Sequence, residues 1–261
     1  MSKQDVRNLL VFGSGRLGSA IKLKFPEVTL ISKEQCDITR REDVDNIIRE
    51  YTPEVIINTS AITDLTLCES NSRLAWDVNV YGARNISFVS NKYKIYSVQI
   101  SSNNAINPVN EYGFTKQACE GLLFSLIVRI DYFDKDHWLI KKILDNSGCS
   151  LLSTNQFNPV YIDTLVNVLI TAINQRISGE VNIGSNRPIS YYDFGMILSN
   201  KLNIIGNNIS KIQSINLPYS YDYDAFLDCS SMRRICNLSL DIEGEISKYV
   251  NFIRKQKDTN N

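Results

Sequence analysis

Short apolar runs alternate with segments of helical periodicity over the first half of the chain. Continuous apolar runs are typical of parallel strands that are buried on both faces, and the segments between them place apolar residues at helical spacing. This alternation predicts an α/β fold with a doubly wound parallel sheet and helices on both faces. The expected strands are 8–12, 28–32, 55–57, 96–100 and 126–130, and the expected helices are 19–25, 41–51, 68–91 and one that opens around Tyr112.

The regular alternation stops after residue 130. The elements expected beyond it are helices at 140–144, 164–175, 191–203 and 243–256 and a strand at 179–184. We therefore expect two parts. Residues 1–187 form mainly the sheet domain, with 131–155 contributing to a smaller lobe, and residues 188–261 complete that lobe.

A glycine-rich turn links the first expected strand to the first expected helix. Its pattern, Gly-x-Gly-x-x-Gly, is typical of a dinucleotide-binding loop in this position. Glycine permits a tight turn and close backbone approach, and the helix N-terminus presents free N–H groups to a pyrophosphate. An ordinary glycine turn is the alternative. The loop residues expected to bind the cofactor are Gly13, Ser14, Gly15, Arg16, Leu17 and Gly18.

The end of the second strand bears on the choice of cofactor. Enzymes that use NAD commonly carry an acid there, which holds the ribose 2′-hydroxyl. Here the strand ends in Ser32 and Lys33, and Arg16 lies in the glycine loop, so cations are available for a 2′-phosphate. The sequence favours NADPH, with NADH as the alternative, although surface cations that serve only solubility would give the same pattern.

A serine, a tyrosine and a lysine follow in an order that suggests redox chemistry. Tyr112 and Lys116 are four residues apart and share one face of a helix. The lysine charge favours phenolate, so the tyrosine gives up its proton more easily near neutral pH. Ser102 ends the preceding strand and offers a hydroxyl to the same region. A Tyr-x-x-x-Lys pair alone is common, and the upstream glycine loop gives it weight as a site that protonates a carbonyl oxygen while hydride reaches carbon.

Two further features point to the edge of the sheet where the strands end. Ser60 and Ala61 are small residues just beyond the third strand, and they leave room for a cofactor at that edge. Asn79 is an amide among apolar neighbours, and a buried amide needs hydrogen-bond partners. We expect it to brace the strand that carries Ser102.

Composition and charge exclude several other classes of function. The 261 residues include 28 basic and 28 acidic side chains without a basic stripe, so no nucleic-acid partner is expected. The absence of a long apolar run or a signal peptide predicts a cytoplasmic protein without a membrane partner. The six cysteines show no CxxC spacing and are interpreted as free thiols, and the single His137 cannot build a histidine metal site, so no metal is expected.

The sequence resembles the extended short-chain dehydrogenase/reductase family, and within it the dTDP-4-dehydrorhamnose reductases. The similarity covers residues 1–185, and spacing beyond them permits a small C-terminal substrate lobe. The matching segments are LLVFGSGRLG, CDITRREDVDNIIREYTPEVIINTSAIT, CESNSRLAWDVNVYGARN, the SS…YGFTK stretch, LIVRIDY and NQFNPVYIDTLVNVL.

The resemblance implies a role for each matching residue. Tyr112 would protonate the C4 oxygen of a 4-keto sugar, Lys116 would bind the nicotinamide ribose and lower the pKa of the phenol, and Ser102 would hydrogen-bond the keto group. Asp37 and Ile38 would flank the adenine. The remaining cofactor contacts are expected from Ser32, Lys33, Ser60, Ala61, Thr63 and Asn79, and the substrate contacts from Thr63, Asn103, Asn104, Gln156 and Pro159.

The chain departs from the family pattern in two places. Its glycine loop is one residue shorter than the family's usual Gly-x-x-Gly-x-x-Gly. The link from Ser102 to Tyr112 is abbreviated, and the loop missing there normally helps to cover the substrate. Asn103 and Asn104 replace an acid and an aromatic, so neither the acid pair of 4,6-dehydratases nor the cysteine of epimerase–reductases is present. An enzyme that only reduces its substrate remains.

The predicted function is NADPH-dependent reduction of the C4 keto group of a nucleotide-linked 4-keto-6-deoxyhexose, in biosynthesis of the dTDP- or UDP-L-rhamnose type. One alternative is a non-catalytic NAD(P)-binding regulatory subunit of the same fold. The abbreviated loop is the observation that suggests it. The other is a reductase or epimerase that acts on another nucleotide sugar or on a small carbonyl compound. Many relatives dimerise, so the expected partners are the nucleotide sugar and a second copy of the chain.

Overall fold

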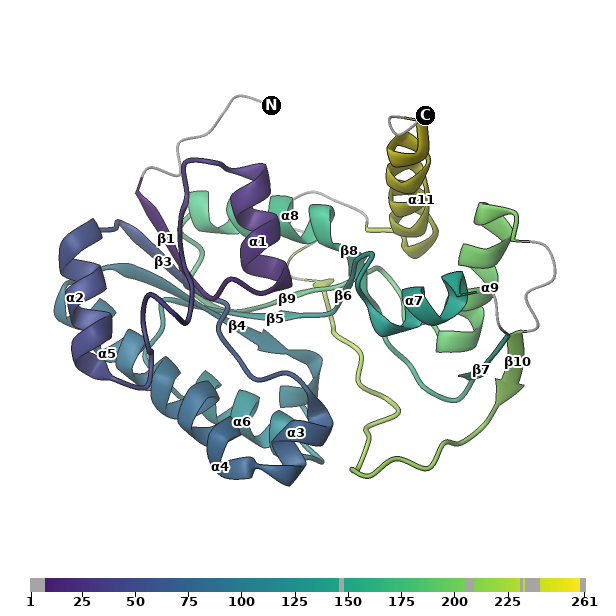
Figure 1. The fold of residues 1–261 in the computed structure, drawn as a ribbon, viewed down its shortest axis with the longest axis horizontal. Helices are drawn as coiled ribbons and strands as arrows, with labels where there is room; N and C mark the ends of the chain where they lie inside the picture. Colours follow the sequence, from purple (N-terminus) through teal and green to yellow (C-terminus); the bar gives the residue numbers. More distant parts are fainter. Residues whose placement is uncertain (1–7, 146–147, 205–208, 231, 233–239, 259–261) are drawn as a thin grey trace. The chain divides into compact units, whose positions relative to one another are not determined.

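A six-stranded sheet organises the first of two units into which the chain divides (Figure 1). The computed structural model describes residues 8–145, 148–204, 209–230, 232 and 240–258. The strand order is β2-β1-β3-β4-β5-β9, and the pairs β1–β2, β1–β3 and β3–β4 are parallel. The strands are β1 (Leu9–Phe12), β2 (Thr29–Ile31), β3 (Val55–Asn58), β4 (Tyr96–Ser102), β5 (Leu126–Ile130) and β9 (Gly179–Ile183).

The strand order places a switch point between β1 and β3. From β1 the chain moves to β2 on one side of the sheet and then returns to β3 on the other. In open α/β sheets, ligands bind outside the carboxyl ends of the strands at such a point. Every residue of β1 and β3 is buried, as their continuous apolar runs predicted. The expected doubly wound fold is confirmed.

Helices cover both faces of this sheet (Figure 1). The figure shows α1 and α8 on one face and α5 and α6 on the other. Apolar side chains of α2 and α5 pack together with those of β1, β2 and β3 in one buried cluster. The helices are α1 (Arg16–Lys24), α2 (Arg41–Tyr51), α3 (Leu65–Ser70), α4 (Ser72–Trp76), α5 (Ala83–Lys92), α6 (Glu111–Glu120) and α8 (Ile162–Asn174).

The single helix expected at 68–91 is wrong, because the chain forms several shorter elements there. Asn71 interrupts it: its backbone leaves the helical conformation, and its side-chain oxygen accepts a hydrogen bond from the N–H of Leu74 at 3.2 Å. This is the geometry of an N-cap, and it starts a new helix, α4. A π-helical segment, Asp77–Gly82, then joins α4 to α5.

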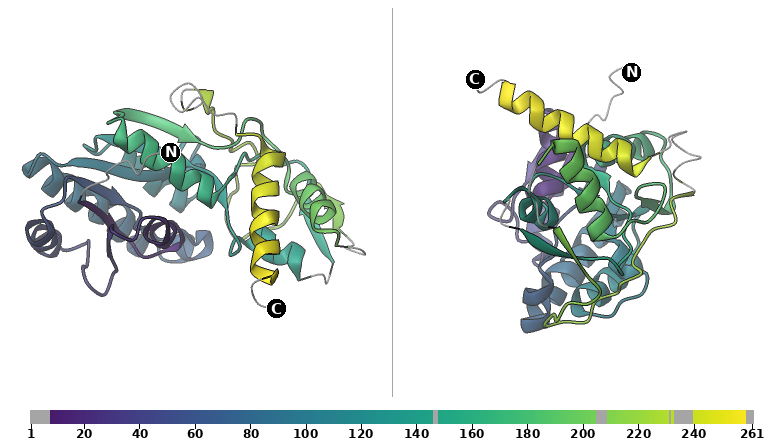
Figure 2. Two further views of the ribbon diagram at one scale, coloured as in Figure 1. Left: turned by 90° about the horizontal axis from the view of Figure 1, so that it is seen from above. Right: turned by 90° about the vertical axis from the view of Figure 1, so that its right-hand side faces the viewer.

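The second unit is built around aromatic side chains. Phe133 lies edge-on to Phe194 and Tyr249, with ring centroids 5.1 Å and 5.9 Å apart. In this unit α9 and α11 pack against each other (Figure 2). Its elements are the parallel pairs β6 (Tyr132–Phe133) with β8 (Val160–Tyr161) and β7 (Cys149–Leu152) with β10 (Ile209–Ile212), and the helices α7 (Trp138–Leu144), α9 (Tyr191–Leu202) and α11 (Ile242–Asp258).

The division between the units does not follow a single boundary at residue 187. The first unit holds the described parts of 1–129, 166–181 and 218–221. The second holds those of 130–165, 182–217 and 222–261. The chain thus passes between the units several times, and residues 131–155 lie in the second.

None of the described helices combines the length and the apolar composition that crossing a bilayer requires. The five described cysteines are buried and form no disulfide, as expected, and Cys236 lies outside the described residues. No cluster of three or more potential metal-ligating side chains occurs among the described residues.

Asp131, at the end of β5, gives the second unit a pH-dependent contact. Its Oδ2 accepts a hydrogen bond from the N–H of Asn158 at 3.0 Å. The residue keeps some exposed surface, but its carboxyl group is enclosed, and this burial raises the pKa of Asp131 to about 7. The folded state therefore holds the proton more tightly than the unfolded chain does.

This raised pKa predicts a loss of stability as the pH rises. The stabilising contribution is fully present below the ordinary pKa of an aspartate, and it is lost as the pH rises through about 7. Asp131→Asn keeps an oxygen acceptor for Asn158 but cannot ionise. Between about pH 5 and pH 8 the wild type should lose about 1–2 kcal/mol more unfolding free energy than this variant, measured by urea denaturation. Equal losses in both proteins would refute the assignment.

Candidate active site

The glycine loop closes tightly against the segment that follows β3. Gly13 has φ +105°, and a Cβ there would lie 2.7 Å from Thr59 Oγ1 and 2.8 Å from the backbone nitrogen of Ser60. The Thr59 hydroxyl donates to the carbonyl oxygens of Phe12 and Gly13, at 2.9 and 3.0 Å. Only glycine fits such a conformation and approach. The loops after β1 and β3 are therefore joined at the switch point of the sheet.

The other two glycines of the loop serve different purposes. A Cβ at Gly18 would lie 1.9 Å from the carbonyl oxygen of Gly13, so no side chain fits between helix α1 and the loop. At Gly15 a Cβ would meet nothing within 4 Å, and no side chain caps the N-terminus of α1 there. Buried Leu17 anchors the helix, while Ser14 is exposed. The backbone at Gly15, where α1 begins, thus borders open space, which leaves room for a diphosphate.

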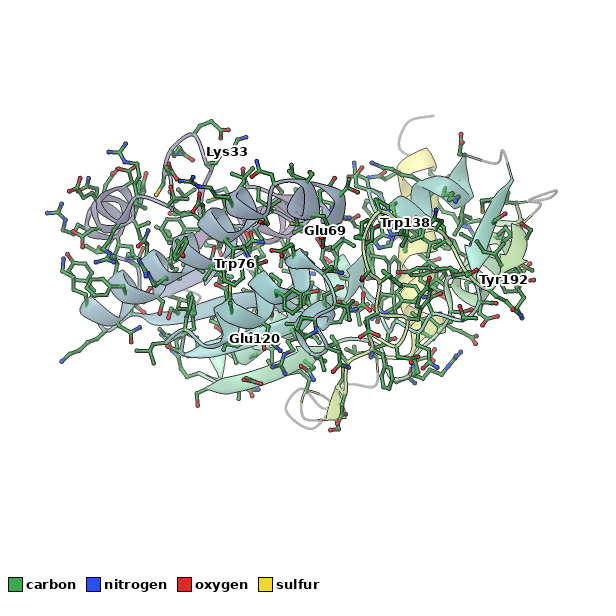
Figure 3. The ribbon with its side chains drawn as sticks, turned by 90° about the horizontal axis from the view of Figure 1, so that it is seen from below. Lys33, Glu69, Trp76, Glu120, Trp138 and Tyr192 are labelled. Atoms are coloured by element: carbon green, nitrogen blue, oxygen red, sulfur yellow. The ribbon has the colours of Figure 1, made fainter. Side chains whose placement is uncertain are left out.

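The cations expected to recognise a 2′-phosphate lie at the surface. The side chain of Lys33 is 91% exposed, with its Nζ 4.0 Å from Glu34, and Figure 3 shows it projecting outward. Arg16 is also exposed. Ser32 is half-buried, and its N–H donates to Gln35 Oε1 at 2.9 Å.

The two residues expected beside the adenine have different environments. The Asp37 carboxylate is exposed and accepts hydrogen bonds from the N–H and the hydroxyl of Thr39, at 3.0 and 2.7 Å. Ile38 is buried, and a Cβ at Gly82 would lie 2.7 Å from its side chain. The Asn85 amide donates to the carbonyl of Ile38 at 3.0 Å and so fixes this turn.

Ser102 ends β4 and is oriented by the two asparagines that follow it. Its Oγ donates to Asn103 Oδ1 at 2.9 Å and accepts hydrogen bonds from the backbone N–H and the Nδ2 of Asn104, both at 3.3 Å. Ser102 is 7% exposed, and both asparagines are half-buried. Asn103 and Asn104 therefore position the serine hydroxyl.

Helix α6 carries Tyr112 in its first turn and Lys116 one turn later. Lys116 is 3% exposed, and its Nζ donates to the carbonyl of Ile100 at 2.7 Å. Ile100 lies two residues before Ser102 on β4, so the lysine lies against the strand that ends in the serine. Burial lowers the pKa of Lys116. Tyr112 is half-buried, and its carbonyl accepts a hydrogen bond from the Thr115 hydroxyl at 2.8 Å.

The abbreviated link between β4 and α6 packs directly on the helix. A Cβ at Gly113 would lie 2.8 Å from the carbonyl oxygen of Asn104 and 3.1 Å from Pro108 Cα. Asn110 caps α6, since its Oδ1 accepts from the N–H of Gly113 at 2.8 Å. An asparagine just before an acidic first turn is an N-terminal signal that the sequence interpretation missed.

Asn79 braces a different segment from the one expected. Its Oδ1 accepts from the N–H of Ile62 at 2.7 Å, and its Nδ2 donates to the Ile62 carbonyl and to Thr115 Oγ1, both at 3.0 Å. The expected brace of the Ser102 strand is therefore wrong. The π-helical segment places this buried amide between α6 and the loop after β3, the loop that contains Ser60, Ala61 and Thr63. Of these three, Ser60 and Ala61 are half-buried and Thr63 is exposed.

Two buried polar groups that the sequence interpretation missed support the strands. Asn58 Nδ2 donates to Gln99 Oε1 at 2.8 Å, and Asn58 Oδ1 accepts from the N–H of Ser60 at 3.0 Å. Glu120, labelled in Figure 3, accepts from Ser101 Oγ at 2.6 Å and forms a two-pronged ion pair with Arg129. A signal for both was present in the sequence: Asn58 follows directly on an apolar run, and Gln99 lies between Val98 and Ile100.

Gln156 and Pro159, expected on the substrate side, lie in the second unit. Gln156 is exposed, and its N–H donates to the carbonyl of Tyr223 at 2.6 Å. Pro159 is buried and immediately precedes β8. Their role in substrate binding stays a prediction.

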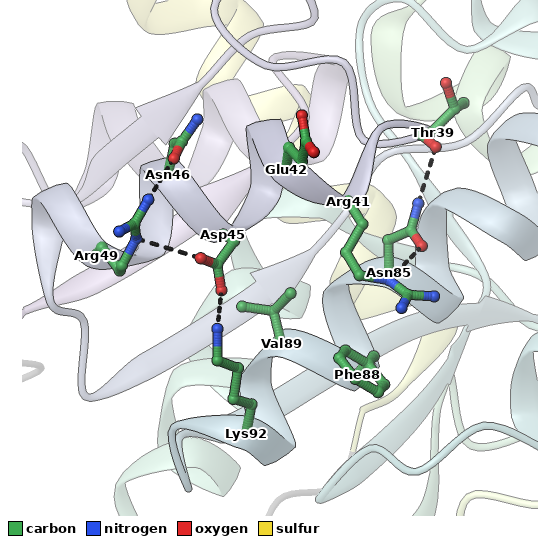
Figure 4. A pocket seen from close by; sticks show the side chains of 10 residues that line it. All are labelled: Thr39, Arg41, Glu42, Asp45, Asn46, Arg49, Asn85, Phe88, Val89 and Lys92. Atoms are coloured by element: carbon green, nitrogen blue, oxygen red, sulfur yellow. Dashed lines mark hydrogen bonds and ion pairs between the residues drawn. The ribbon is translucent and has the colours of Figure 1, made fainter.

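A separate cavity of about 650 Å³ lies between α2 and α5 (Figure 4). Asp45 pairs there with Lys92 at 2.7 Å and with Arg49 at 3.2 Å. The Arg41 guanidinium lies 4.3 Å from the centre of the Phe88 ring. None of the predicted site residues lines this cavity, so it is not the candidate active site.

Comparison with known proteins supports this picture. Residues 16–134 match a family described as polysaccharide biosynthesis protein. The chain is 24% identical to a dTDP-4-dehydrorhamnose reductase of Aggregatibacter actinomycetemcomitans, over 90% of each chain. It is 22% identical to a probable low-salt glycan biosynthesis reductase of Haloferax volcanii, over 81% of this chain and 78% of the other.

The fold also matches a solved structure over nearly its full length. The crystal structure of a dTDP-4-dehydrorhamnose reductase from Bacillus anthracis in complex with NADP has a TM-score of 0.86 to this chain. The two are 20% identical, and the match covers 94% of this chain and 98% of the other. The chain therefore has the fold of the extended short-chain dehydrogenases/reductases. Within that class it resembles the dTDP-4-dehydrorhamnose reductases, and the resemblance predicted from its motifs is confirmed.

Proposed function

We propose that the protein is an NADPH-dependent oxidoreductase that reduces the C4 keto group of a nucleotide-linked 4-keto-6-deoxyhexose. The observation that carries this proposal is the position of Lys116, buried against the strand that ends in Ser102 and one helical turn after Tyr112. The reductase names of the relatives and the NADP in the Bacillus anthracis structure support the substrate class and the cofactor.

The residues of the first unit fit NADPH, which supplies the hydride when bound. The glycine loop and the N-terminus of α1 would hold the diphosphate, because Gly15 borders open space there. Asp37 and Ile38 would flank the adenine, and Arg16 and Lys33 would pair with the 2′-phosphate. The residues after β3, which Asn79 fixes to α6, would lie along the cofactor.

Tyr112 is the proposed proton donor. Its phenol would donate a proton to the oxygen at C4, and the charge of Lys116 would favour the phenolate that remains. Ser102, oriented by Asn103 and Asn104, would hydrogen-bond the keto oxygen. Amide side chains cannot transfer the protons of a dehydration, which restricts the reaction to reduction.

The test is turnover by the purified protein. NADPH fluorescence should fall on addition of a dTDP- or UDP-linked 4-keto-6-deoxyhexose, and the corresponding deoxysugar should form. NADPH binding without turnover of either substrate would contradict the proposal and favour a regulatory subunit of the same fold. The cytoplasmic location and a second copy of the chain as partner stay predictions.

Cofactor selectivity gives a second test. Because exposed cations that pair with a phosphate contribute charge-assisted hydrogen bonds, Arg16→Ala and Lys33→Ala should each raise the dissociation constant for NADPH about fivefold. The constant for NADH should stay within about twofold, since NADH lacks the 2′-phosphate. Isothermal titration measures both constants, with Lys94→Ala as the control for loss of a surface cation. Equal weakening of both cofactors would contradict the assignment.

A further inference from the structure

Four residues of the C-terminal region belong to the first unit. The segment Pro218–Tyr221, here called the strap, groups with the sheet domain, although the residues on both sides of it belong to the second unit. An irregular segment that joins a sheet domain for four residues needs specific contacts to hold it there. A hydrogen bond from Asn110 supplies such a contact.

Asn110 holds the strap at the N-terminus of helix α6. Its Nδ2 donates to the carbonyl of Ser220 at 3.0 Å, while its Oδ1 caps the helix through the N–H of Gly113. The side chain of Asn110 is buried, with 4% of the residue exposed. Asn110 lies two residues before Tyr112, so one amide fixes both the strap and the helical turn that carries the tyrosine.

Tyr219 precedes Ser220 in the strap and is half-buried. Burial, and then the charge of Asp64, raise the pKa of Tyr219. Asp64 immediately follows Thr63 and caps α3 by accepting from the N–H of Leu67 at 2.9 Å. The strap is therefore hydrogen-bonded to the segment after β4, and Tyr219 lies close enough to the segment after β3 to sense the charge of Asp64. These two segments carry most of the residues predicted to bind the substrate and the nicotinamide end of the cofactor.

We propose that the strap is a wall of the substrate site and that Tyr219 contacts the hexose of the nucleotide sugar. This inference rests on the proposed function. The strap is fastened at Asn110 to the short link between Ser102 and Tyr112, two of the proposed catalytic residues. Neighbouring Cα atoms are about 3.8 Å apart. Tyr219 is next to Ser220, and Asn110 is two residues before Tyr112, so the hydrogen bond between Asn110 and Ser220 brings Tyr219 toward the helical turn beside which the proposed reaction would take place.

A tyrosine suits this position chemically. Its ring offers an apolar face to the C–H groups of a sugar, and its hydroxyl can hydrogen-bond a sugar hydroxyl. Because Tyr219 would contact the hexose and not the cofactor, its loss should affect substrate binding selectively. This selectivity separates a substrate contact from a merely structural role.

The test compares Tyr219→Ala and Tyr219→Phe with the wild type. Tyr219→Ala should raise KM for the 4-keto nucleotide sugar about tenfold, and Tyr219→Phe, which keeps the ring, about threefold. The dissociation constant for NADPH should stay within about twofold of that of the wild type. Tyr81→Ala, at an exposed tyrosine of the π-helical segment, is the matched control and should change neither constant.

The outcomes separate this inference from the proposed function. If the wild type is an active reductase and both Tyr219 variants keep its KM, the proposed role of the strap is overturned and the proposed reductase function stands. If the wild type reduces no 4-keto sugar, the proposed reductase function is overturned. Amide hydrogen exchange would then test whether the strap forms a wall of the substrate site. Slower exchange of residues 219–221 with dTDP-glucose and NADPH present, compared with NADPH alone, supports a wall of the substrate site. Unchanged exchange overturns it.

Discussion

Replacing Tyr112 with phenylalanine is expected to lower kcat by about two to four orders of magnitude, because a positioned general acid contributes that much. The phenylalanine ring can occupy the same half-buried place in the first turn of α6, so the fold should be preserved. The dissociation constant for NADPH should remain within about twofold. Steady-state kinetics and isothermal titration measure the two effects.

The control for this substitution is Tyr81→Phe, which removes an exposed phenol from the π-helical segment and should leave kcat unchanged. If Tyr112→Phe retained the activity of the wild type, another group would have to supply the proton. If it lost NADPH binding together with turnover, the tyrosine would serve the cofactor site and not the chemistry.

Replacing Lys116 with methionine is expected to lower turnover and raise stability at the same time. Methionine matches the length of the lysine stem without the ammonium, so kcat should fall about 100-fold or more as the charge proposed to favour the phenolate is lost. Burial disfavours the charged lysine in the folded state, which lowers its pKa. Removing this cost should raise Tm by about 2–4 °C, although the hydrogen bond to the Ile100 carbonyl is lost.

The sign of this stability effect follows from the direction of the shift. Because the folded pKa of Lys116 lies below the unfolded value, the unfolded chain binds the proton more tightly, and wild-type stability rises with pH through that window. Lys116→Met should lack this rise, which thermal denaturation at several pH values would reveal. A variant with Tm below that of the wild type at neutral pH would contradict the assignment, since the charge would then stabilise the fold.

The candidate site shows which parts of a sequence interpretation depend on local pattern. The Gly-x-Gly-x-x-Gly turn was predicted where it stands, between β1 and α1, because strand, turn and helix are contiguous in sequence. The four-residue spacing of Tyr112 and Lys116 on α6 was predicted for the same reason. The helix at 68–91 failed because Asn71 can stay in a helix or cap a new one, and periodicity does not distinguish these outcomes.

The partners of buried amides could not be predicted. Asn79 was expected to be buried and hydrogen-bonded, and it is, yet its partners Ile62 and Thr115 lie 17 and 36 residues away. Asn110 reaches Ser220 across 110 residues. An amide offers the same donor and acceptor to any partner, so its identity in the sequence does not encode which one it meets.

The alternation of strands and helices, the glycine loop and the order of Ser102, Tyr112 and Lys116 could be predicted from the sequence. These features follow from periodicity and from the conformational freedom of glycine, which act over a few residues. The folded structure was needed to show that Lys116 lies against β4, that two asparagines orient the serine, and that the strap joins the sheet domain. These contacts link segments distant along the chain, or depend on the rotamers that packing selects, and no local pattern specifies either.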